Sequence, residues 1–91
     1  MDTTMQAEIH AIEQELMLGT GPFMPVNVAM TRLCESAVRA AENKGERQAL
    51  LACAAARNVC DRGLRDRGAS ASDRQRITEH AVCVIAARLT A

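Results

Sequence analysis

The apolar residues of this chain recur at the spacing of an α-helix, which leaves little room for any other fold. Near the N-terminus they stand four, three and four positions apart, at Met5, Ile9, Ile12 and Leu16. Positions separated in this way lie on one face of a helix. Similar stripes follow along the chain. They predict an all-α fold, a small four-helix bundle with helices near residues 4–18, 26–44, 46–67 and 72–90.

Glycine and proline mark the breaks between these predicted helices. Residues 19–25 hold both prolines and two of the five glycines, so we expect a turn or short ordered loop there. The Asn-Lys-Gly run at 43–45 is a stop signal, and because it is short, the second and third helices should form an antiparallel hairpin. Residues 68–71 form the last break. After it, Ser72 and Gln75 fit a capping box, which predicts the start of the last helix.

One face of each predicted helix should point toward the core. In the second helix, the inward residues should be Met30, Leu33, Ala37, Val38 and Ala41. In the third helix, they should be Ala49, Cys53, Ala56, Cys60 and Leu64. In the last helix, they should be Ile77, Ala81, Val84, Ile85 and Leu89.

Small side chains dominate this expected core. The chain is 48% hydrophobic, but Phe23 is its single aromatic residue. Small side chains fill space only where helix backbones approach closely. They also bury little apolar area, so a chain of 91 residues has a thin stability reserve, about 0.05–0.15 kcal/mol per residue. A chain of this length has room for one helical domain, over residues 1–91. Because association between two copies adds buried area, we also expect this domain to form a homodimer.

Four cysteines raise the question of a metal or redox site. Zinc and iron–sulfur sites usually take ligands from short-range pairs such as C-x₂-C, but the closest pair here is Cys53 and Cys60. On a helix these two stand about 10.5 Å apart, too far for one ion or a disulfide. Cysteine on an apolar stripe packs as a small hydrophobic residue. We therefore expect core packing and no metal, with a redox pair such as Cys34 and Cys83 as the alternative.

No residue pattern in the chain predicts catalysis or a cofactor. His10 and His80 lack the Glu-x-x-His spacing of a carboxylate-bridged metal centre, and we expect them at the surface. A nucleophilic pair of Cys83 and His80 would lack oxyanion donors and a third orienting group. Residues 19–22 follow a helix and precede no Lys-Ser/Thr pair, unlike a phosphate-binding loop. The chain is therefore predicted to be no enzyme.

Charge is unevenly distributed although the formal net charge is zero. Residues 1–31 carry four acidic residues and no Lys or Arg, whereas residues 32–91 carry all eleven basic residues against seven acidic ones. Six arginines gather between positions 57 and 76. In outline this region resembles a helix-turn-helix that would present Arg74, Gln75 and Thr78 to base edges. Three interleaved aspartates and the overall neutrality disfavour nucleic-acid binding.

The chain is also expected to stay in the cytoplasm, away from membranes. Its N-terminus has neither the positive segment nor the apolar segment of a secretory signal. The longest uncharged apolar run, residues 49–56, is less than half of what a membrane-spanning helix needs.

These observations favour a non-enzymatic protein that acts through protein–protein contacts, as a regulator, adaptor or chaperone-like module. The candidate docking surfaces are the acidic first helix, the methionine-bearing loop after it and the arginine-rich region. The candidate partner-binding residues are Met17, Phe23, Met24, Arg62, Arg65, Arg74 and Arg76. A DNA-binding regulator and a thiol-based redox sensor are the two alternatives.

Overall fold

Four helices make up the part of the chain that the computed structural model describes, residues 3–17 and 24–91. They are α1 (Thr3–Met17), α2 (Val26–Ala41), α3 (Glu46–Asp66) and α4 (Ala71–Thr90). No strand occurs among the described residues, and the predicted four-helix, all-α fold is confirmed. Over the same ranges, no helix combines the length and the apolarity that crossing a membrane requires.

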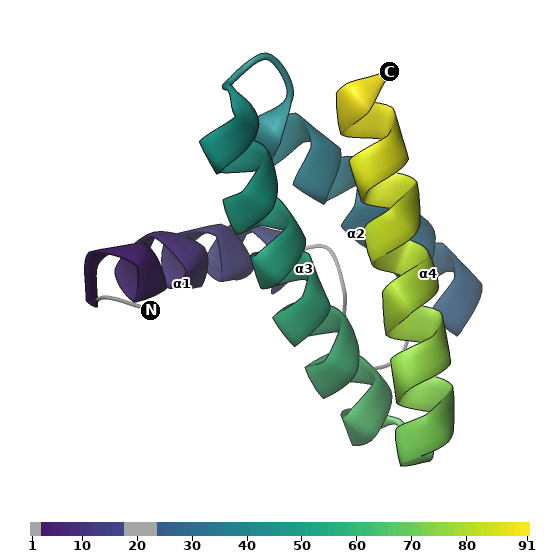
Figure 1. The fold of residues 1–91 in the computed structure, drawn as a ribbon. Coiled ribbons are helices and arrows are strands. Elements are labelled where there is room, and N and C mark those ends of the chain that lie inside the picture. The colour runs from purple at the N-terminus through teal and green to yellow at the C-terminus, as the bar shows by residue number, and fades with distance from the viewer. Residues whose placement is uncertain (1–2, 18–23) are drawn as a thin grey trace.

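The third helix, α3, makes the most extensive contacts of the four. It contacts α1, α2 and α4, and α2 also contacts the three other helices, whereas α1 in its described part contacts only α2 and α3. Figure 1 shows α4 beside α3 and running in the opposite direction, with α1 lying across α3. α2 and α3 also run in opposite directions through their short connection, as the predicted hairpin requires.

The second helix ends at Ala41, three residues before the predicted end. The chain turns there through Asn43 (φ 62°) and Gly45 (φ 93°), both in the left-handed region. Glycine adopts this conformation without a steric penalty, and asparagine tolerates it better than most residues. The Gln48 side chain donates a hydrogen bond to the Ala40 carbonyl at 3.3 Å. That bond gives a partner to a carbonyl in the last turn of α2, where the helix itself supplies none.

The last helix begins at Ala71, and Ser70 rather than Ser72 caps its N-terminus. The Ser70 hydroxyl accepts a hydrogen bond from the backbone N–H of Asp73 at 3.1 Å. The predicted capping box of Ser72 and Gln75 is therefore wrong.

The way in which α3 ends explains this shift. Gly68 takes a left-handed conformation (φ 79°), and the N–H of Ala69 bonds to the Leu64 carbonyl at 3.0 Å. Together these features close α3 in a motif common at helix C-termini. Ser70 then has the extended backbone, φ −66° and ψ 160°, that an N-cap residue needs.

The core is built from small apolar side chains of all four helices. The predicted inner face of α1 is buried at Ile9, Ile12 and Leu16. In α2, the buried residues are Ala29, Leu33, Ala37, Val38, Ala40 and Ala41. Met30, predicted to face inward, is half-buried and packs against this core.

The buried face of α3 is wider than the single predicted stripe. Its buried residues are Leu51, Ala52, Ala55, Ala56, Val59, Cys60 and Leu64. Ala49 and Cys53, predicted to point inward, are half-buried, and Cys53 packs against the core. The reason is that three helices cover α3, so the buried side chains span more of its circumference than one neighbour would cover. In α4, Ala81 and Ile85 are buried as predicted, together with Thr78.

Candidate functional site

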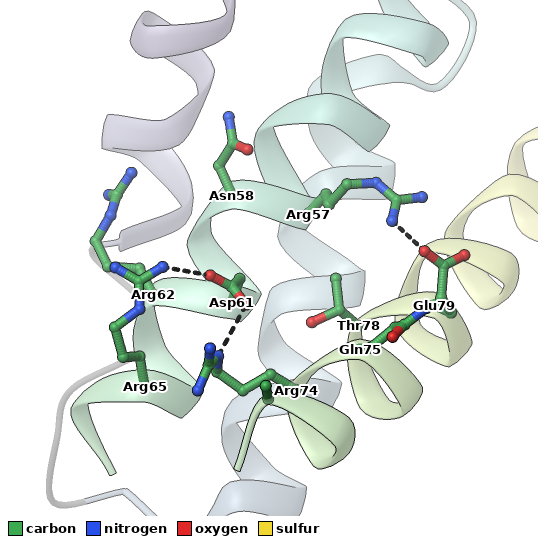
Figure 2. Close-up of a pocket in the computed structure, with 10 residues that line it drawn as sticks. Arg57, Asn58, Asp61, Arg62, Arg65, Arg74, Gln75, Thr78 and Glu79 are labelled. Carbon is green, nitrogen blue, oxygen red and sulfur yellow. Dashed lines mark hydrogen bonds and ion pairs between the residues drawn. The ribbon is translucent and has the colours of Figure 1, made fainter. Parts of the chain in front are cut away.

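A pocket lined by arginines lies between α3 and α4, toward the turn that joins them (Figure 2). Its volume is about 520 Å³, and we call it the arginine pocket. The charged residues that line it are Arg57, Arg62, Arg65 and Arg74, with the carboxylates Asp61 and Glu79. Three of the predicted partner-binding residues, Arg62, Arg65 and Arg74, therefore meet in one place.

Asp61 lies between two of these arginines and holds both. Its Oδ2 is 2.6 Å from Nη2 of Arg65, one turn further along α3, and its Oδ1 is 3.1 Å from Nε of Arg74 on α4. Partial desolvation opposes ionisation of Asp61, but the hydrogen bonds and positive charges of Arg65 and Arg74 outweigh it. They lower the pKa of the Asp61 carboxyl below its ordinary value. Asp61 is therefore ionised across the physiological pH range.

Arg74 is the most firmly held arginine of the pocket. Besides Asp61, it bonds to the backbone carbonyl of Ala69 through Nη1 at 2.8 Å, and its side chain is only 23% exposed. These two contacts tie the first turn of α4 to α3 and to the connection between them. Arg74 therefore shapes the pocket wall rather than reaching out of it.

Arg62 connects the pocket to α1 through a buried carboxylate. Its Nη2 lies 2.8 Å from Oε1 of Glu13, while Nδ2 of Asn58 donates to Oε2 of the same residue at 3.3 Å. The Glu13 side chain is 8% exposed. A carboxylate that is so far removed from water needs charged and hydrogen-bonding partners of this kind. The pair also fixes where α1 crosses α3.

Arg57 and Glu79 form the other end of the pocket. They are an ion pair between α3 and α4 in which Nη1 of Arg57 donates to Oε1 of Glu79 (Figure 2). The Arg57 side chain is 46% exposed, and that of Arg65, across the pocket, is 62% exposed. These two guanidinium groups are accessible to a ligand in solution.

The remaining predicted partner-binding residues lie elsewhere. Arg76 does not line the pocket; it is 71% exposed and pairs with Asp73 at 3.4 Å, within α4. Met24 is half-buried, and its carbonyl accepts a hydrogen bond from Arg67 at 2.8 Å. Met17 ends α1, and its side chain lies outside the described part of the structure, as does the whole of Phe23.

The cysteines and histidines lie at separate places in the fold. No three His, Cys, Asp or Glu residues of the described ranges are placed to hold a metal ion. Cys60 is buried and accepts a hydrogen bond from Thr78 at 3.4 Å, whereas Cys83 is exposed. Both histidines are exposed, as predicted; His10 interacts with Gln14, and His80 lines a separate pocket between α2 and α4.

Five polar residues that line the arginine pocket or bind one of its arginines were not predicted as site residues: Glu13, Arg57, Asn58, Asp61 and Glu79. Glu13 carries a signal in the sequence, because it follows Ile9 by four positions and precedes Leu16 by three. That spacing places a carboxylate on the apolar face of a helix, where it requires a partner. The partner itself lies on another helix and cannot be identified from local spacing.

The arrangement can bind an anion of modest size. With Glu13, which pairs with Arg62, the four guanidinium groups face three carboxylates, which leaves one positive charge in excess. Asn58 and Gln75 add neutral donors to the lining. Guanidinium forms planar, two-point hydrogen bonds with carboxylate groups. Among known proteins, no family model, no curated protein and no solved structure matches the chain.

Proposed function

We propose that this protein is a non-enzymatic interaction protein and that its arginine pocket binds an acidic segment of a partner protein. The observation that carries the proposal is the convergence of Arg57, Arg62, Arg65 and Arg74 on one pocket between α3 and α4. These residues are separated by up to seventeen positions in the sequence, so only the folded hairpin of α3 and α4 brings them together.

The four arginines would divide the work of binding. Arg74 is only 23% exposed and is held by Asp61, so it gives the pocket its shape. Arg62 is bound to Glu13 but is about as exposed as Arg57. Arg57 and Arg65 are about half exposed, and the internal ion pair of each uses one terminal nitrogen of the group. Because a guanidinium carries five N–H donors, each of these two arginines can bind a ligand carboxylate as well as its internal partner.

A peptide carboxylate suits this pocket better than a nucleic-acid backbone does. Asp61 and Glu79 stand among the arginines and interrupt the continuous positive surface that a long row of phosphates requires, whereas one or two carboxylates need only a single site. Two of the three side chains suggested for base recognition are also engaged elsewhere, since Thr78 is buried and Arg74 is held by Asp61. The DNA-binding alternative therefore has less support than the peptide-binding one.

Fluorescence anisotropy tests the proposal with a fluorescein-labelled peptide rich in glutamate and a counterpart in which glutamine replaces every glutamate. We expect binding of the glutamate peptide alone. Arg57→Ala and Arg65→Ala should each weaken that binding about two- to fivefold, as expected for ion pairs open to solvent. Arg76→Ala is the matched control, because it removes the same charge outside the pocket.

Two results would count against the proposal. One is equal binding of the two peptides. The other is an equal loss of peptide binding in Arg65→Ala and Arg76→Ala, which would show that binding depends on the overall charge of the protein and not on the pocket. Short duplex DNA, added as a competitor, decides between the peptide-binding and DNA-binding hypotheses. Homodimer formation stays a prediction, which light scattering of the purified chain would test.

A further inference from the structure

A second pocket adjoins the arginine pocket where α1 crosses α3. Its volume is about 760 Å³, and we call it the α1 groove. α1 lines it from Thr3 to Glu13, and α3 lines it at Ala54, Arg57 and Asn58. Arg57 and Asn58 line the arginine pocket as well, so the two pockets meet at these side chains. A ligand that is bound in the arginine pocket and extends past Arg57 therefore reaches the α1 groove.

The α1 groove has no guanidinium group to spare for a ligand carboxylate. One acidic and one basic residue line it, Glu13 and Arg57. The Glu13 carboxylate is already bound by Arg62 and Asn58, and it would repel a second carboxylate brought next to it. The groove therefore suits a neutral part of a ligand, in contrast to the arginine pocket.

Arg57 presents a different part of its side chain to each pocket. Its guanidinium group points toward α4, where it pairs with Glu79 (Figure 2). The methylene groups are then the part of the side chain that is left to line the α1 groove. Arginine commonly packs its methylene groups against apolar surface while the charged end stays accessible. Arg57 thus offers charge to one pocket and apolar surface to the other.

Small apolar residues of α1 and α3 complete the lining of the α1 groove. Ile9 is buried, Ala54 is half-buried and Ala7 is exposed. Because Ala7 and Ala54 end at the β-carbon, they leave room between the two helices for a side chain from another molecule. An apolar side chain gains free energy when such a surface removes it from water.

We infer that the arginine pocket and the α1 groove together bind one partner segment, in which an apolar residue such as leucine stands beside acidic residues. The inference rests on the function proposed above and specifies its ligand more closely. The acidic side chains bind the guanidinium groups of Arg65 and Arg57, and the apolar side chain enters the α1 groove. Solvent-exposed ion pairs discriminate poorly among acidic segments, because each contributes little. The groove adds a preference for one kind of acidic segment.

The length of the site sets the length of this segment. Ala54 and Arg65 are eleven positions apart on α3, which corresponds to about 16.5 Å along the helix axis. An extended peptide advances by about 3.3 Å per residue, so about five residues cover this distance. Arg57 lies nearer to the Ala54 end. The acidic residues should therefore occupy most of the segment, with the apolar residue at one end.

Fluorescence anisotropy with short labelled peptides tests the inference. Each peptide contains a run of four glutamates; one carries leucine after the run and another carries it before, because the segment can run along α3 in either direction. In the matched peptides serine replaces leucine. We expect leucine at one of the two ends to tighten binding about three- to tenfold relative to serine, as partial burial of its side chain predicts.

Two glutamine variants on α1 locate the effect. Ala7→Gln places a longer neutral side chain at an exposed position of the α1 groove. It should remove the gain from leucine and leave binding of the serine peptides unchanged. Ala11→Gln is the matched control, because Ala11 is also exposed on α1 but does not line the groove. It should change neither measurement.

The results separate this inference from the function on which it rests. If the serine peptides bind and leucine adds nothing at either end, the inference is overturned and the acidic-segment function stands. The same holds if the gain from leucine survives in Ala7→Gln or is lost equally in Ala11→Gln. If no glutamate peptide binds, both the inference and the proposed function are wrong.

Discussion

Glu13 of α1 and Arg62 of α3 form an ion pair at 2.8 Å in which the carboxylate, but not the guanidinium, is removed from water. The amide of Asn58 donates a further hydrogen bond to the second carboxylate oxygen. An apolar contact between α1 and α3 can slide, whereas this three-residue contact has one geometry. The crossing of the two helices is therefore fixed by polar groups set within an apolar interface.

Loss of the Arg62 side chain should destabilise the fold. Arg62→Ala leaves the Glu13 carboxylate buried with Asn58 as its remaining side-chain partner, and we expect a loss of about 1–3 kcal/mol in the free energy of unfolding. Glu13→Gln keeps a hydrogen-bonding group without the charge and should cost less. Urea denaturation measures both, with Arg76→Ala as a control expected to change stability by about 0.5 kcal/mol or less. Equal effects of Arg62→Ala and Arg76→Ala would refute the assignment.

The free energy of unfolding should depend on pH through the ionisation of Asp61. Its pKa is lower in the folded protein than the ordinary aspartate value, because Arg65 and Arg74 stabilise the ionised form. A lowered pKa contributes stability that is complete above the ordinary value and is lost as the pH falls through the folded one. The free energy of unfolding of the wild type minus that of Asp61→Asn should therefore be constant near neutral pH and shrink in the acid range. A difference that does not vary with pH would contradict this.

Ser70 and Ser72 should respond differently to the same substitution. Ser70→Ala removes the side-chain cap of α4 and should lower the free energy of unfolding by about 1 kcal/mol. Ser72→Ala, in the first turn of the same helix, removes no described capping bond and should be close to neutral. Thermal or urea denaturation of the two variants separates the positions. If Ser72→Ala had the larger effect, the sequence-based capping box would be restored.

Local spacing was sufficient to predict the helices and most of their inner faces. Met5, Ile9, Ile12 and Leu16 define one face of α1 because every residue in the stripe belongs to the same helix. The start of α4 could not be settled in this way. Ser70 and Ser72 are both of a residue type that can cap a helix N-terminus. Which of them caps α4 depends on how Gly68 closes the helix before them.

The candidate site was predictable only in part, for a similar reason. Clustered arginines in the sequence pointed to the right region, but the pairing that distinguishes Arg74 from Arg76 depends on which side of α4 faces α3. The half-buried residues Ala49 and Cys53 of the predicted stripe show the same difficulty, because one helix surrounded by three has no single inward face.

The central position of α3 also determines which helices can separate from the fold before the whole protein unfolds. α1 contacts α2 and α3 but, in the described residues, not α4, so it can detach while the other three helices stay packed. α3 cannot detach by itself, because its departure would expose the inner faces of all its neighbours. Its central amide protons should therefore exchange with solvent only through complete unfolding, whereas those of α1 have a less costly route through a partly unfolded state.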